Sequence, residues 1–213
     1  TVSGKNSYTT TLGEGDSKIN EVIKEVKNNF KDIDFVLEFD FAKENIFNVI
    51  SNLIDFEGLV ALDLFAGTGS ISFELLSREC QTVTAVEKNN AHANFIAKVA
   101  KELKTNSLHL IRGDVFRYLN TAPSKSFDFI FADPPYFMQI EEGKKLFRVE
   151  GTEFDGCDDD WDKFESMKVY TDWTRQWLQE ARRILKDNGS ICVISGMQSI
   201  YEIGSIMREL GYW

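Results

Sequence analysis

The sequence predicts an α/β domain whose mostly parallel β-sheet is covered by helices on both faces. Apolar, strand-like segments alternate with amphipathic helical segments from about residue 59 onward. These strand-like segments are nearly continuous apolar runs, which is typical of parallel strands buried on both faces. At 213 residues, the chain is also long enough to bury a core of ordinary size.

Five segments have the apolar, β-branched character of strands, and a helical segment lies after each of them. The strands are expected at residues 59–65, 82–87, 108–114, 127–133 and 190–195. The helices are expected at residues 69–78, 89–103, 115–119, 170–186 and 199–210. We expect Asn188-Gly189 to stop the fourth of these helices.

The N-terminal part of the chain stands outside this alternation. It predicts helices over residues 17–30 and 41–54 and a short strand over residues 34–39. We therefore expect residues 1–39 to be an extension of unknown role and residues 40–213 to form the main domain.

Composition narrows the class of protein. The chain is 43% hydrophobic, and no apolar run approaches the roughly 20 residues that span a bilayer, so we expect no membrane association. Its three cysteines lack paired or zinc-ligand spacing, which favours reduced thiols in a cytoplasmic protein. The net charge of −10 is unusual for a nucleic-acid-binding protein. However, eleven acidic and five basic residues lie between Met138 and Asp172, so the acidity is concentrated there.

Ligands bind at the carboxyl ends of strands in parallel sheets, so the strand ends hold the candidate site residues. The first strand continues into a turn with Gly67 and Gly69, where small residues let the backbone approach a ligand. A tight turn without a ligand is the alternative. Glu87 lies 20 residues after Gly67, where an acid suits ribose hydroxyls or a helix N-terminus. Asp114 suits either an adenine amino group or a helix cap.

The fourth strand ends in the sequence Asp133-Pro134-Pro135-Tyr136, which we call the DPPY corner. Prolines fix φ and remove N–H donors but keep their carbonyl acceptors. An acid, a rigid carbonyl and an aromatic ring suit the task of holding a base by its exocyclic amino group. Hydrogen bonds to Asp133 and Pro134 would favour a pyramidal nitrogen that attacks a methyl sulfonium, and Tyr136 would stack on the base.

Together, "LDLFAGTGS", "AVEKN", "RGDVF" and "DPPY" resemble the motifs of the class I S-adenosylmethionine-dependent methyltransferases. The resemblance implies their Rossmann-like fold, with its last strands missing here, S-adenosylmethionine as cofactor, and no metal. The implied catalytic residues are Asp133, Pro134, Pro135 and Tyr136. The implied cofactor-binding residues are Asp63, Phe65, Ala66, Gly67, Thr68, Gly69, Glu87, Lys88, Asp114 and Val115.

The two halves resemble different families. Residues 40–136 resemble the bacterial 16S ribosomal RNA guanine-N2 methyltransferases, and residues from about 133 to 213 resemble the β-group DNA adenine-N6 or cytosine-N4 methyltransferases. The chain therefore reads as a composite that joins at the DPPY corner. Both resemblances imply a nucleic-acid partner. The first expectation is methylation of guanine N2 in rRNA, and the second is methylation of DNA. A third hypothesis is a protein that binds the cofactor without catalysis. An NAD enzyme is disfavoured because the dinucleotide-binding motif G-x-G-x-x-G/A would have a third Gly or Ala where this chain has Ser72.

The segment after the DPPY corner is rich in acids and aromatics. Its acids lack the spacing of a calcium loop, and a solvated loop is the expected interpretation. The DNA-enzyme resemblance implies instead that Trp161, Phe164 and Tyr170 line a base pocket. The favoured alternative is that some of these three are core residues that anchor the next helix. Trp173, Trp177 and Leu178 have helical spacing and are expected in the core.

Overall fold

The computed structural model describes residues 43, 45–137, 146–147, 153–154 and 162–212. The chain divides into two compact units, Thr1–Asp55 and Phe56–Trp213, which are described separately. In the first unit, residues 45–50 are helical, in agreement with the helix predicted over residues 41–54. The helix predicted over residues 17–30 and the strand predicted over residues 34–39 lie outside the described residues.

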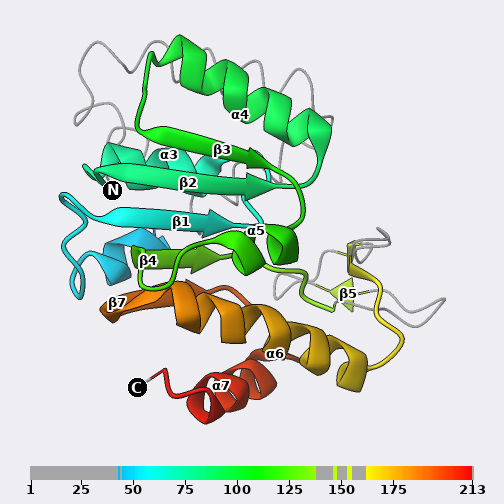
Figure 1. Cartoon of the computed structure of the whole chain (residues 1–213). Coiled ribbons are helices and arrows are strands. Elements are labelled where there is room, and N and C mark those ends of the chain that lie inside the picture. Colours follow the sequence, from blue (N-terminus) through cyan, green and yellow to red (C-terminus); the bar gives the residue numbers. More distant parts are fainter. Residues whose placement is uncertain (1–42, 44, 138–145, 148–152, 155–161, 213) are drawn as a thin grey trace, which may run out of the picture. The chain divides into compact units, whose positions relative to one another are not determined.

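The second unit contains a five-stranded sheet in which every neighbouring pair is parallel (Figure 1). Its strands are β1 (Val60–Leu64), β2 (Thr82–Glu87), β3 (Leu108–Arg112), β4 (Phe127–Ala132) and β7 (Leu185–Val193). The order across the sheet is β3-β2-β1-β4-β7. This confirms the predicted α/β class and all five predicted strands. Two short strands, β5 (Leu146–Phe147) and β6 (Glu153–Phe154), form a separate antiparallel pair.

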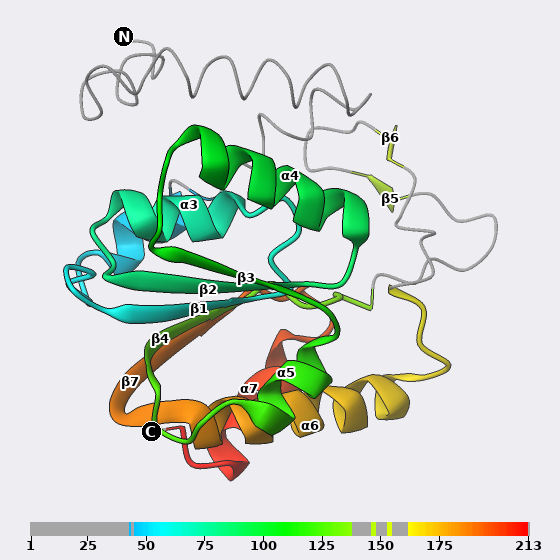
Figure 2. The same ribbon diagram turned by 45° about the horizontal axis from the view of Figure 1, so that its top comes forward.

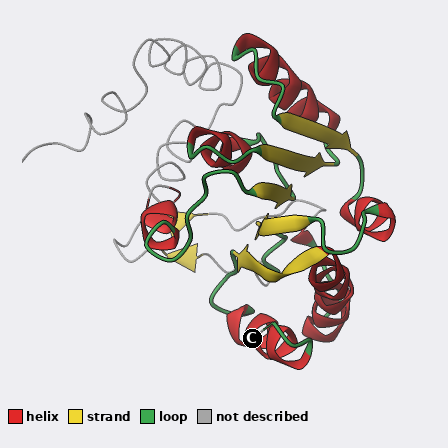
Figure 3. Ribbon diagram, turned by 60° about the vertical axis from the view of Figure 1, so that its left-hand side comes forward, coloured by secondary structure: helices red, strands yellow, loops and turns green. Residues whose placement is uncertain are grey.

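Helices cover both faces of this sheet, as Figures 2 and 3 show. They are α3 (Ser70–Ser77), α4 (Asn90–Glu102), α5 (Val115–Thr121), α6 (Met167–Ile184) and α7 (Ile200–Glu209). Helices α3 and α4 lie on one face, and α5, α6 and α7 lie on the other. No helix in the described ranges is long and apolar enough to cross a membrane.

Local side chains explain where most helices begin. The Asn89 side chain accepts the backbone N–H groups of Ala91 and His92 at the start of α4. The Ser166 hydroxyl accepts the Val169 N–H at the start of α6, so this helix begins several residues before the predicted start. Such caps satisfy backbone donors that have no partner inside the helix.

The predicted end of α6 at Asn188-Gly189 is wrong. The helix ends at Ile184, and β7 begins at once with Leu185. Leu185 pairs with Phe127 but Ser190 pairs with Phe129, so the register shifts between them. Gly189 lies in this irregular part, where a Cβ atom would come within 3.0 Å of the Asp128 carbonyl oxygen. The glycine therefore allows close approach of β7 to β4 at a strand irregularity, and it does not end the helix.

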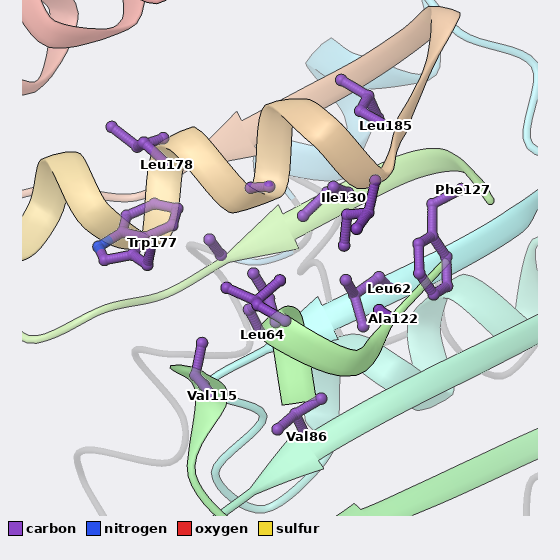
Figure 4. Close-up of a cluster of buried hydrophobic side chains, with 14 of the residues drawn as sticks. Leu62, Leu64, Val86, Val115, Ala122, Phe127, Ile130, Trp177, Leu178 and Leu185 are labelled. Atoms are coloured by element: carbon purple, nitrogen blue, oxygen red, sulfur yellow. The ribbon is translucent and has the colours of Figure 1, made fainter. Parts of the chain in front are cut away.

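The main core lies between the sheet and helices α5, α6 and α7 (Figure 4). Leu62, Leu64 and Ile130 of the central strands pack there with Trp177 and Leu178 of α6. Both of these α6 side chains are fully buried, which confirms their predicted place in the core. Burial of large apolar side chains contributes about 1.5–3 kcal/mol each, so this face anchors the ends of β1 and β4 firmly.

Candidate active site

Hydrogen bonds between the strand ends gather the predicted site residues at one edge of the sheet. The Ala66 N–H donates to the Val86 carbonyl (3.0 Å), and the Asp133 N–H donates to the Leu64 carbonyl (3.3 Å). The chain runs from β1 outward through β2 and β3, then returns to place β4 on the other side of β1. The strand order thus reverses between β1 and β4, which is where ligands bind in such sheets.

The turn after β1 has an unusual backbone. Phe65, Gly67 and Gly69 all have left-handed φ angles, of 63°, 54° and 79°. Gly69 immediately precedes α3, and its position leaves little room: a Cβ atom there would lie 2.8 Å from Ile96 Cγ1. At Gly67 a Cβ atom would meet nothing within 4 Å. The first glycine of the turn therefore borders open space, and the second borders the core.

Glu87 ties this turn to the start of α4. Its Oε2 accepts the Gly67 N–H (2.7 Å), and its Oε1 accepts the Asn89 N–H (2.5 Å). The residue is only 8% exposed, so these bonds compensate for the loss of water around the carboxylate. Each carboxylate oxygen can accept a second hydrogen bond, which leaves capacity for the hydroxyls of a ribose.

Asp63 is a buried acid within β1. Its Oδ2 accepts the Ser72 hydroxyl (2.5 Å), whereas its Oδ1 is buried and has no hydrogen-bond partner among the described residues. Burial raises the pKa of Asp63 to about 7, and the nearby charges of Asp133 and Glu87 act in the same direction against the Ser72 hydrogen bond. An unpartnered polar atom at this place fits a site that binds a polar ligand group.

The raised pKa of Asp63 predicts a specific pH dependence of stability. Because the folded protein holds the proton more tightly than the unfolded chain, stability from this group is full below pH 3.8 and is lost as the pH rises toward about 7. We expect Asp63→Asn to remove this dependence. The measurement is the free energy of unfolding of both proteins from pH 4.5 to 8. A difference between them that stays constant over this range would contradict the assignment.

The two glycines of the turn should respond differently to alanine. Gly67→Ala should cost only the left-handed conformation, about 1–2 kcal/mol, but should weaken cofactor binding because its methyl group enters the open space. Gly69→Ala should cost about 1–3 kcal/mol more because it also forces Ile96 to move. Thermal unfolding and cofactor titration of both variants would test this. Equal losses of stability would contradict the described packing.

The other predicted cofactor residues divide between the site and the core. Asp114 caps α5 by accepting the Phe116 N–H (2.9 Å), which confirms the capping interpretation. The adenine interpretation remains a prediction. Lys88 Nζ lies 3.9 Å from Asp114 Oδ2 at the surface. The Val115 side chain is buried in the core, and Phe65 packs at 5.8 Å from the rings of Trp173 and Trp177. The Val115 side chain is therefore part of the core, and the half-buried Phe65 ring packs against it. The predicted cofactor contact of both residues remains a prediction.

The DPPY corner is held against the sheet with its acid and its tyrosine together. The Tyr136 hydroxyl donates to Asp133 Oδ1. Burial raises the pKa of Asp133, and the Tyr136 hydrogen bond opposes this effect. Burial and the Asp133 charge raise the pKa of Tyr136. The Tyr136 hydroxyl therefore supplies a hydrogen bond to a carboxylate that has lost most of its water.

Side chains from later in the sequence hold the backbone of the corner. The Pro135 carbonyl accepts the Tyr170 hydroxyl (3.1 Å), and the Tyr136 carbonyl accepts the Ser199 hydroxyl (3.4 Å). In contrast, the Pro134 carbonyl accepts no hydrogen bond from any residue in the described ranges. This rigid acceptor, without a partner among the described residues, belongs to the residue that directly follows Asp133.

Sequence reasoning missed several residues that shape this site. Asp162 was expected in a solvated acidic loop, but it is 2% exposed and accepts the Phe137 N–H (2.7 Å). Gln198 donates to the Phe137 carbonyl (2.8 Å). Neither position belongs to a motif, and the only signal was the proximity of Asp162 to aromatic residues. Trp161 and the acids Asp155, Asp158, Asp159 and Asp160 lie outside the described residues.

Aromatic side chains connect the turn after β1 with the DPPY corner. Trp173 contacts the rings of Phe65 (5.8 Å), Phe164 (5.4 Å) and Tyr170 (6.2 Å). Tyr170 is fully buried and Trp173 is half-buried. Tyr170 and Phe164 therefore pack with one another and with the core side of the corner, and their predicted contact with a base remains a prediction.

Two family models match the chain, and they overlap at the corner. The family described as conserved hypothetical protein 95 matches residues 38–150, and the DNA methylase family matches residues 127–213. The shared residues 127–150 contain β4 and the DPPY corner. The composite pattern that the sequence predicted is therefore present, with its junction where it was expected.

Curated relatives match about half of the chain. The type II methyltransferase M.HinfI from Haemophilus influenzae is 51% identical over 104 residues, which make up 49% of this chain and 28% of that protein. The type II methyltransferase M2.DpnII from Streptococcus pneumoniae is 30% identical over 111 residues, or 50% of this chain and 39% of that protein. The chain thus spans well under half the length of these relatives.

Solved structures share the fold at low sequence identity. A putative RNA methyltransferase from Pyrococcus horikoshii superposes with a TM-score of 0.54 at 20% identity and covers 80% of this chain and 67% of that one. The putative methyltransferase yhhF from Escherichia coli gives a TM-score of 0.51 at 19% identity, with 75% and 71% covered. A SAM-dependent methyltransferase from Aquifex aeolicus gives 0.52 at 16% identity, with 77% of each chain covered.

Proposed function

The chain belongs to the family described as conserved hypothetical protein 95, and on this premise we propose that it methylates an exocyclic amino group of a nucleic-acid base. The predicted resemblance to class I methyltransferases, their Rossmann-like fold and S-adenosylmethionine as the cofactor are confirmed by the family matches and the shared fold. The activity and the substrate belong to the proposal.

The residues at the β1 and β2 ends fit this cofactor. The Glu87 carboxylate has the charge and free acceptor capacity to hold ribose hydroxyls, and Gly67 borders open space. Asp63, whose buried Oδ1 has no partner among the described residues, lies on β1 just before the same turn. When bound, S-adenosylmethionine supplies an electrophilic methyl group on a sulfonium. No residue of this set needs a metal to perform these roles.

The observation that carries the proposal is the pair of acceptors at the DPPY corner. The Asp133 carboxylate and the Pro134 carbonyl, which has no partner among the described residues, can accept the two N–H groups of one amine. These bonds favour a pyramidal nitrogen, whose lone pair is then available for attack. The target amine can bind Asp133 either through Oδ2 or by displacing the Tyr136 hydroxyl from Oδ1, and displacement frees Tyr136 to stack on the base. Positioning is the main catalytic contribution in this mechanism.

We favour DNA as the substrate, with adenine N6 or cytosine N4 as the target atom. The side chains that hold the corner, among them Tyr170, Gln198 and Ser199, all lie within residues 127–213, which match the DNA methylase family. The relative with 51% identity is also a type II methyltransferase. Guanine N2 of rRNA, which was the first expectation from the sequence, is now the second candidate. It is retained because the cofactor half resembles the rRNA methyltransferases.

Labelled S-adenosylmethionine offered in parallel with duplex DNA, naked rRNA and small ribosomal subunits tests both candidates. We expect label in DNA, recovered after digestion as N6-methyladenine or N4-methylcytosine. Label in rRNA alone would replace the DNA proposal with the second candidate. Cofactor binding without transfer to any of the three would instead support a cofactor-binding protein without catalysis.

A further inference from the structure

Phe137, the residue directly after the DPPY corner, has an unusual backbone conformation. Its φ angle is 57°, in the left-handed region that residues with a side chain rarely adopt. Such a residue persists only where its surroundings hold it, and strain of this kind concentrates at functional sites. The conformation therefore requires interactions that keep Phe137 in place.

Both polar backbone groups of Phe137 are held by side chains distant in sequence. Asp162 Oδ1 accepts its N–H at 2.7 Å, and Gln198 Nε2 donates to its carbonyl at 2.8 Å. The Phe137 ring stacks on Tyr170, with ring centres 5.5 Å apart and an angle of 19° between the planes. Three separate parts of the chain thus converge on this one residue.

Among the side chains that hold Phe137, the Asp162 carboxylate loses the most favourable hydration on burial. It is 2% exposed, and a buried carboxylate is retained only where hydrogen bonds compensate for lost water. After burial and the effects of Asp133, the Asp162 charge is a further cause of the raised pKa of Tyr136. The carboxylate therefore lies close to the corner as well as to the residue after it.

On the premise of the function proposed above, we propose that Asp162 is a positioning residue that holds Phe137 in its left-handed conformation and thereby orients the Asp133–Tyr136 corner. The two prolines restrict the backbone before Tyr136. Asp162, with Gln198 in a supporting role, restricts it directly after Tyr136. The Tyr136 side chain, which donates to Asp133, lies between these two restricted positions.

The test compares Asp162→Ala with Asp162→Asn. Alanine removes the acceptor of the Phe137 N–H, so kcat should fall by about 100-fold, the effect of a misplaced reacting group, while cofactor affinity stays unchanged. Asparagine keeps a side-chain oxygen and should recover most of kcat. The control is Asp172→Ala, because Asp172 is an exposed acid on α6 whose partner is Lys168. The control should retain full activity.

A second readout does not depend on activity. The Phe137 amide should exchange slowly with solvent in the wild type and in Asp162→Asn, and faster in Asp162→Ala. Rapid exchange in the wild type, or a kcat that Asp162→Asn does not recover, would overturn the inference. If the wild type methylates none of the offered substrates, the proposed function fails, and amide exchange alone still decides the role of Asp162. Should Asp162→Ala not fold, Gln198→Ala tests the same arrangement, because Gln198 is exposed.

Discussion

Asp133→Ala is expected to slow methyl transfer by about 100- to 1,000-fold while S-adenosylmethionine still binds with its original affinity. The carboxylate is the charged member of the acceptor pair, and removal of one such preorganised group costs about 100- to 1,000-fold in rate. The turn after β1 and Glu87 do not hydrogen-bond to the Asp133 side chain, so the cofactor-binding residues keep their contacts. Single-turnover transfer and equilibrium cofactor binding would be measured on the same preparation.

Stability distinguishes a catalytic Asp133 from a structural one. Burial raises the pKa of Asp133, so its ionised form is held at a cost, and its replacement should not lower the unfolding temperature strongly. The matched control is Asp187→Ala, which removes an exposed acid paired with Lys125. Parallel loss of transfer, cofactor binding and folding in Asp133→Ala would mean that Asp133 has a structural role.

Glu87→Gln should produce the largest loss of cofactor affinity. The carboxylate accepts the N–H groups of Gly67 and Asn89 through different oxygens, whereas an amide offers only one acceptor oxygen. One of these backbone donors therefore loses its partner, and the ribose hydroxyls lose a charged acceptor. Hydrogen bonds to charged groups contribute about 1.5–3 kcal/mol, so the Kd should rise by roughly 10- to 100-fold. Calorimetric titration with S-adenosylmethionine measures this change.

Glu102→Gln is the control for this prediction, because Glu102 is an exposed acid at the end of α4. It removes the same charge from the chain but touches none of the strand ends. A Kd for Glu87→Gln that equals the value for Glu102→Gln would show that Glu87 serves the turn alone and does not bind the cofactor.

The elements of the main unit were largely predictable because each strand carries its own signal. Segment 82–87 is apolar and β-branched, and β2 has the predicted bounds. The end of α6 was not predictable in the same way. Asn188-Gly189 has the composition of a helix stop, but pairing of Leu185 with Phe127 starts the strand earlier, and Gly189 serves a register shift. Pairing with a distant strand therefore overrode a local preference.

The candidate site shows the same division. Glu87, Asp114 and Asp133 lie at the ends of predicted strands, and parallel strands place their carboxyl ends at one edge. Their chemical class and position thus follow from the local sequence. The burial of the Val115 side chain and the ring contacts of the half-buried Phe65 side chain, by contrast, depend on which rings and strands surround them. Sequence alone grouped all of these residues as cofactor contacts.

The local sequence carries the chemistry of this protein, since short-range patterns of apolar and polar residues determine the strands, their ends and the acids at those ends. The tertiary structure decides which groups remain available to a ligand. Tyr136 occupies Asp133, Asp162 and Gln198 hold Phe137, and the Pro134 carbonyl has no partner within the described ranges. The Tyr136–Asp133 bond joins residues three positions apart, but the two hydrogen bonds to Phe137 join residues 25 and 61 positions apart. No local pattern records these two bonds, because only the folded chain brings the segments before α6 and α7 to the end of β4.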